Sequence, residues 1–224
     1  MAMQVWITTT NQLKRQVYLK DTVEQFKELW YDVYLNIDDW TKWIRVNKYE
    51  CVMEAWKRAI EKKTWLLFCE DDIKLCRWFW DYINDLNGDI LFYSLFHFPN
   101  LTWDSMIWWK KYKMYWRLWV YSAPKLYNEQ CIYVHKDRVQ EYVDMYDDFY
   151  KNKEQLREEF PKWARHPDII FWRYAYKKWI KLYSVYPELV QHIGKISWVW
   201  NRIIPYDFSS YFLDDLRETV CKFE

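Results

Sequence analysis

The chain has 224 residues, and its 33 lysines and arginines nearly cancel its 32 aspartates and glutamates. A chain of this length encloses one sizeable hydrophobic core and leaves little room for a second, so we expect one domain over residues 1–224. The balanced charge excludes a strong overall attraction to nucleic acids or anionic membranes, and no apolar run reaches the about 20 residues of a membrane span. We therefore predict no membrane partner and a location in the cytoplasm, which is the host cytoplasm if the source is viral.

Aromatic residues make up 22% of the chain, with 18 tryptophans and 20 tyrosines, whereas only 2 residues are glycines. This usage predicts a core of large, flat side chains, and drift in base composition, as in a virus, explains most of it. The 5 cysteines are scattered and lack a CxxC pair, so they indicate neither a disulfide framework nor a zinc cluster. A reducing compartment fits these cysteines.

The first part of the chain alternates segments with strand-like and helix-like patterns. A β-rich stretch leads to apolar residues at helical spacing, then to a second strand-like run, a second helical pattern and a very apolar run. These segments are residues 4–9, 13–29, 31–37, 48–63 and 65–69. We expect the last of them, WLLFC, to be a buried central strand.

The same alternation continues further along the chain. Helical patterns cover residues 78–86, 139–149 and 169–178, and strand-like runs cover 89–96 and 130–135. Between Phe149 and His166 lies a charged helical segment that ends near Pro161. Strands that alternate with helices predict an α/β fold with a mixed, mostly parallel sheet flanked by helices.

Three carboxylates, Glu70, Asp71 and Asp72, directly follow the most apolar strand. In parallel sheets, ligands bind at the carboxyl ends of the strands. Adjacent carboxylates repel one another and are costly to desolvate, so this placement calls for a counter-cation, and hard oxygen ligands suit Mg²⁺ or Mn²⁺. The ordinary alternative is that these residues cap the next helix or lie in a solvated loop.

A second segment, YPELVQHIGKIS at residues 186–197, combines polar side chains with one of the two glycines. Pro187 ends a strand, Gln191 and His192 present polar groups, and Gly194 permits a tight turn. A lone histidine is more often structural than functional. His192 follows a strand-like run and precedes a rare glycine, which favours a functional role.

These two segments resemble parts of one known family. LLFCEDDI at residues 66–73 resembles the strand and DXD motif of glycosyltransferases with the single-domain, Rossmann-like GT-A fold, including small viral and phage enzymes, and YPELVQHIGKIS is similar to a segment near the end of many small members. The resemblance implies a divalent metal held by Asp72 and His192, and a nucleotide-sugar donor ordered by Glu70, Asp71 and Gln191.

The resemblance also implies a general base and a nucleoside site. Asp168, in HPDIIFW before the helix from residue 169, stands where related enzymes deprotonate the acceptor hydroxyl, and such a base makes the reaction inverting. An ordinary N-cap is the alternative for this residue. Near the end of the first strand, the polar side chains expected to seat a uracil nucleoside are Thr8, Thr9 and Arg15, with Asp38 and Asp39 at the ribose. Threonines also favour strands for packing reasons.

The acceptor is expected to meet the aromatic and basic segment at residues 100–121, through Trp109, Lys111, Lys113 and Arg117. Aromatic faces stack on sugars and on unpaired bases alike, and lysines attract a phosphate backbone. Phage DNA carrying hydroxymethylated pyrimidines is therefore one candidate acceptor, and a solvated aromatic hairpin is the ordinary alternative.

The sequence thus predicts a metal-dependent glycosyltransferase that moves a hexose or pentose from a nucleoside diphosphate sugar, with uridine diphosphate (UDP) as the expected carrier, to an acceptor hydroxyl. A glycan or a protein remains an alternative acceptor. A nucleic-acid-binding module without catalysis is one alternative function. A metal-dependent nucleotidyltransferase or hydrolase is another, because paired carboxylates serve those chemistries too.

Overall fold

The computed structural model of the protein describes residues 3–10, 13–28, 32–38, 53, 56–77, 79–95, 110–115, 118–123, 131–161, 167–186, 188–193, 196–197 and 202–203. The predictions for Asp39, Trp109, Arg117 and Gly194 lie outside the described residues. The side chains of Thr8, Arg15, Lys111, Lys113, Asp168 and His192 also lie outside the description, although their backbones are placed.

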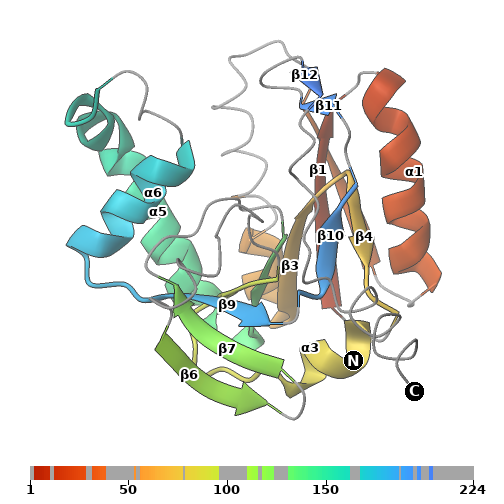
Figure 1. The fold of residues 1–224 in the computed structure, drawn as a ribbon, viewed down its shortest axis with the longest axis horizontal. Helices are drawn as coiled ribbons and strands as arrows, with labels where there is room; N and C mark the ends of the chain where they lie inside the picture. Colours follow the sequence, from red (N-terminus) through yellow and green to blue (C-terminus); the bar gives the residue numbers. More distant parts are fainter. Residues whose placement is uncertain are drawn as a thin grey trace, which may run out of the picture.

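An eight-stranded sheet in the order β2-β1-β3-β8-β5-β9-β7-β6 forms the centre of the fold (Figure 1). Within it, β8 and β7 run opposite to the other strands, which share one direction. The predicted mixed, mostly parallel α/β sheet is therefore confirmed. Its strands are β1 (Met3–Thr10), β2 (Asp32–Asp38), β3 (Trp65–Glu70), β5 (Tyr93–Ser94), β6 (Lys110–Tyr115), β7 (Leu118–Ala123), β8 (Cys131–Val134) and β9 (Leu182–Tyr186).

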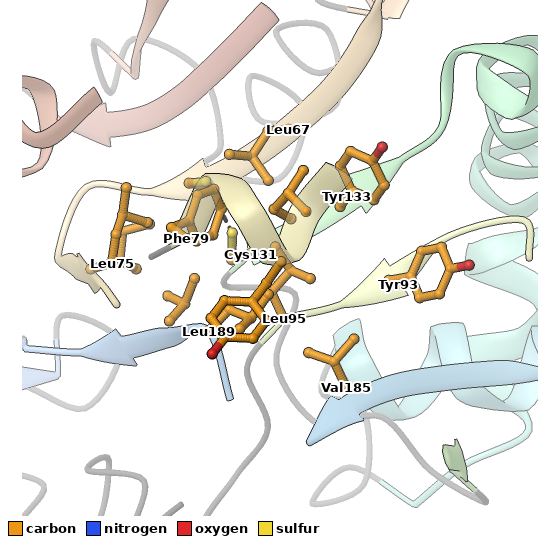
Figure 2. Close-up of a cluster of buried hydrophobic side chains, with 14 of the residues drawn as sticks. Leu67, Leu75, Phe79, Tyr93, Leu95, Cys131, Tyr133, Val185 and Leu189 are labelled. Atoms are coloured by element: carbon orange, nitrogen blue, oxygen red, sulfur yellow. Dashed lines mark hydrogen bonds between the residues drawn. The ribbon is translucent and has the colours of Figure 1, made fainter. Parts of the chain in front are cut away.

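Helices cover both faces of this sheet, and each face has its own hydrophobic core. The first core lies under α1 (Leu13–Glu28) and α3 (Phe79–Asp85), and Figure 2 shows part of it around Phe79 and Leu95. The second core lies under helical residues 56–62, α5 (Val139–Glu158) and α6 (Pro167–Lys177), with a 3-10 turn, η1 (Lys136–Arg138), before α5. Among the described helices, none is long and apolar enough to cross a bilayer.

The central strand β3 is apolar on both faces because it separates the two cores. Leu67 and Cys69 belong to the first core, whereas Leu66 and Phe68 belong to the second. A strand with both faces buried needs a continuous apolar run rather than an alternating one, which explains the sequence WLLFC. The run ends at Glu70, so the acidic residues begin where the sheet ends.

The structure corrects three predicted boundaries. The strand predicted at residues 89–96 is confined to Tyr93–Ser94, because the Asn87 side chain accepts a hydrogen bond from the Asp89 amide at 3.1 Å and forms a turn there. The helix predicted at 139–149 and the charged helical segment predicted to end near Pro161 form one helix, which ends at Glu158. Helix α6 starts at Pro167, a residue suited to the first helical position, so Asp168 is its second residue and does not precede it.

Two helices end at non-glycine residues in the left-handed region, Lys63 with φ 51° and Trp179 with φ 58°. At both ends, the amide of the left-handed residue and the next amide donate hydrogen bonds to carbonyls of the helix in the same pattern. In the second helix, Trp179 N donates to Tyr176 O and Ile180 N to Ala175 O. Glycine usually occupies this position because it lacks a Cβ. Trp179 is 89% exposed, so burial of its ring contributes little to offset the cost of the left-handed backbone.

Cys69 and Cys131 face each other on β3 and β8 with their Sγ atoms 3.1 Å apart, and both are buried free thiols. Burial above all, then Cys131 and the nearby Glu70, raise the pKa of the Cys69 thiol. Alkylation requires the thiolate, so we expect iodoacetamide to label Cys69 and Cys131 in the folded protein only at the rate of global unfolding. Peptide mapping by mass spectrometry after timed labelling measures this rate. Full labelling of both within the first time point, at a pH where the fold is intact, would contradict it.

Candidate functional site

The acidic strand end and the second motif lie side by side. Directly after Asp72, the chain forms a short strand, β4 (Ile73–Leu75), which pairs antiparallel with β10 (Val190–His192). Ile73 is opposite His192 in this ribbon, and the Ile193 amide donates a 2.8 Å hydrogen bond to the Asp72 carbonyl. In Figure 1 the two strands run together beside β3. The structure therefore places the backbone of His192 next to the acidic residues.

The three carboxylates differ in exposure. Asp71 and Asp72 are both 0% exposed, whereas Glu70 is half-buried at the end of β3. The Thr9 hydroxyl donates a 2.6 Å hydrogen bond to Asp71 Oδ2, and Thr9 is itself buried. Burial of a charged carboxylate is costly, so a nearby cation would complement these two buried aspartates.

Helix α1 binds the backbone of the same turn from the other side. Thr22, fully buried on α1, places its hydroxyl 2.9 Å from the Asp71 carbonyl and 3.1 Å from the Ile73 carbonyl. Gln25 donates to the Ile73 carbonyl at 3.2 Å and accepts from the Leu75 amide at 2.8 Å. The turn is thus held between α1 and β10.

The ribbon rests on the first hydrophobic core. Leu75 and Leu189 pack there near Phe79 and Leu95 (Figure 2). Backbone bonds join the layers, from the Cys76 amide to the Leu189 carbonyl at 2.9 Å and from the Leu189 amide to the Leu95 carbonyl at 3.2 Å. Gln191 is buried in β10, opposite Lys74.

The remaining predicted residues are placed by their backbones. Thr8 is level with Glu70 in the parallel pair of β1 and β3, and Arg15 lies in the first turn of α1, which follows β1. Lys111 and Lys113 lie on the edge strand β6, which β8, β5, β9 and β7 separate from β3. Sheet pairing therefore brings Thr8 to the acidic end but does not bring Lys111 or Lys113 there.

Sequence reasoning missed three polar residues of this region, Thr22, Gln25 and Glu188. Thr22 lies between the buried Leu19 and Phe26 on α1, and Glu188 is fully buried shortly before β10. The available signal was a polar residue at the helical spacing of an apolar face, and a carboxylate inside an apolar run.

The donor atoms of the site fit a hard divalent cation, because carboxylate oxygens are the preferred ligands of Mg²⁺ and Mn²⁺. Among the side chains that the structure describes, no group of three or more His, Cys, Asp or Glu residues is arranged to hold a metal ion. The imidazole of His192 is outside that description.

No protein-family model matches the chain, and no curated protein matches it. Among solved structures, the chain is similar to a glycosyltransferase involved in the glycosylation of the major capsid of PBCV-1, with a TM-score of 0.41 and 15% sequence identity. The match covers 66% of this chain and 66% of that one.

Proposed function

We propose that the protein is a metal-dependent glycosyltransferase that moves a sugar from a nucleoside diphosphate sugar to an acceptor hydroxyl. The proposal rests on the β4–β10 ribbon, which joins the acidic turn after Glu70, at Asp71 and Asp72, to the segment of Gln191 and His192. Neither segment alone distinguishes a functional site from a solvated turn. Their pairing at the carboxyl end of a buried strand is the arrangement expected of one ligand site.

In this proposal the residues divide the work by position. Asp72 and His192 hold the metal, Glu70 and Gln191 contact the diphosphate, and Thr8 and Arg15 lie near the nucleoside, for which uracil is the proposed base. When bound, the metal neutralises the departing diphosphate as a Lewis acid. Asp71 belongs to the same anionic cluster, with one carboxylate oxygen held by Thr9.

Asp168 is the proposed base that removes the proton of the acceptor hydroxyl, and a single displacement with such a base inverts the anomeric carbon. For the acceptor we propose hydroxymethylated pyrimidines of DNA, contacted by the basic segment that contains Lys111 and Lys113 on β6. Lysines on an edge strand would supply positive charge to a phosphate backbone that lies along the sheet edge.

Thermal unfolding with nucleotides tests the donor site. We expect UDP or a UDP-sugar with Mn²⁺ to raise the melting temperature by roughly 5 to 10 °C at saturating concentration, because a ligand that binds only the folded state stabilises it. The shift should vanish with EDTA and be smaller with ADP. The same small shift for every nucleotide, unaffected by EDTA, would contradict the proposal.

Product analysis separates the proposed transfer from its rivals. With a UDP-sugar and DNA that contains hydroxymethylated pyrimidines, a glycosyltransferase releases UDP and adds the sugar to the hydroxyl of the hydroxymethyl group. Release of the sugar phosphate together with a nucleotide-modified product would identify a nucleotidyltransferase instead. Retention of the anomeric configuration would overturn the role of Asp168 as the base of a single displacement.

A further inference from the structure

We propose that Thr22 and Gln25 of α1 form a clamp that positions the acidic turn at residues 71–75, and that Thr9 fixes Asp71 within it. The inference rests on the proposed function, because it assigns positioning residues to the same donor site. It changes the expected role of Thr9 from nucleoside contact to the support of Asp71, whose carboxylate it bonds at 2.6 Å.

The backbone of the turn alternates between two partners. The carbonyls of Asp71 and Ile73 and the amide of Leu75 bond to side chains of α1. The carbonyl of Asp72, between them, accepts from Ile193 on the opposite edge. Successive peptide groups of an extended chain point to opposite edges, so the two sets of bonds fix the segment from both sides.

Gln25 acts as a substitute for a neighbouring strand. Its side-chain NH2 group donates to the Ile73 carbonyl, and its side-chain oxygen accepts from the Leu75 amide. A residue of a parallel strand makes the same two bonds, to residues two apart on its partner. β4 pairs with β10 on its other edge. The clamp therefore satisfies an edge of β4 that would otherwise be buried against a helix without hydrogen bonds.

Apolar residues would be the ordinary choice for the covered face of α1. Thr22 is fully buried next to Leu19, Phe26 and the turn, and a hydroxyl is costly to bury unless it is bonded. Its bonds reach the carbonyls on both sides of Asp72, so they set the position of that residue's backbone. Metal and diphosphate ligands must be held to within a fraction of an ångström, which such a clamp provides.

Matched substitutions separate the hydroxyl and amide bonds from packing. Thr22→Val removes the hydroxyl at nearly constant shape, and Thr22→Ser keeps it. Gln25→Met removes the amide while preserving the length of the side chain. Phe26→Leu on the same helix is the control, because it weakens the core contact with Phe79 without touching the turn.

Two measurements are made on each variant under conditions where all are folded. Calorimetric titration of UDP in the presence of Mn²⁺ should show affinity at least tenfold weaker in Thr22→Val and Gln25→Met, and within threefold of wild type in Thr22→Ser and Phe26→Leu. Amide hydrogen exchange should be about tenfold faster at Ile193 in Thr22→Val and Gln25→Met, and also at Leu75 in Gln25→Met, whose bond is lost.

Amide exchange tests the clamp, and UDP affinity tests the proposed function, so the two can fail separately. Unchanged exchange at Ile193 in both variants overturns the clamp, whatever the nucleotide does. If the wild type binds no UDP with Mn²⁺, the proposed donor fails, and faster exchange at Ile193 still supports the positioning of the turn. Equal loss of affinity in Phe26→Leu would mean that general destabilisation, not positioning, controls the site.

Discussion

Replacing Asp72 by asparagine should reduce the affinity for UDP with Mn²⁺ by at least a hundredfold and leave the ligand-free protein no less stable than the wild type. The substitution keeps the shape of the side chain but removes the charge that we propose binds the metal. Asp72 is fully buried, and burial disfavours the charged form of a carboxylate, so the neutral amide avoids this desolvation cost. A structural carboxylate would show the opposite pattern, with stability lost and ligand response unchanged.

Titration calorimetry gives the affinity, and thermal unfolding without ligand gives the stability. Asp81→Asn is the matched control, because Asp81 is an exposed carboxylate in the first turn of α3 that lies outside the ribbon. It should bind UDP and Mn²⁺ like the wild type. A ligand-free Asp72→Asn protein that melts well below the wild type, with undiminished affinity, would remove Asp72 from the proposed metal site.

Replacing Gln4 by methionine should raise the free energy of unfolding by about 1 to 3 kcal/mol, the cost of a buried polar group without a partner. Gln4 on β1 is 1% exposed, and within the described part of the protein neither its Oε1 nor its Nε2 has a hydrogen-bond partner. It lies opposite Leu66 of β3, in an apolar layer. Methionine keeps the unbranched shape and adapts to irregular gaps.

Urea unfolding followed by circular dichroism measures the change, and the slope should be unaltered. Gln155→Met serves as the control, because Gln155 is an exposed residue of α5 where the same exchange should alter stability by less than about 0.5 kcal/mol. A loss of stability in Gln4→Met would show that the amide has a bound partner, such as an enclosed water molecule.

The position of the acidic turn at the end of a buried central strand could be predicted from the sequence because two strong signals coincide. A continuous apolar run marks β3 as a central strand, and three carboxylates at its end cannot continue into the core. The pairing of this end with β10 was not predictable from spacing. A strand of three residues such as β4 gives no usable periodicity, and its partner is defined by tertiary contacts alone.

The roles of the supporting residues could not be predicted, for a different reason. Thr9 was expected near a ligand because it lies at the end of a strand, but the sequence gives no information about which side chain its hydroxyl bonds. Thr22 and Gln25 lie in a helix whose pattern reads as amphipathic with or without them. Their role depends on the direction of backbone groups in the turn, which only the folded chain determines.

The β4–β10 ribbon also imposes an order on folding during synthesis. Strands β1, β2 and β3 leave the ribosome before β4 and can pair with one another, but β10 follows β4 only after α3, β5 to β9, α5 and α6 have been made. Contacts between distant segments are slow to form, because closing a long loop costs chain entropy. The nascent protein therefore carries its acidic turn with one edge unpaired until residues 190–192 have also been made, and the candidate site is completed only then.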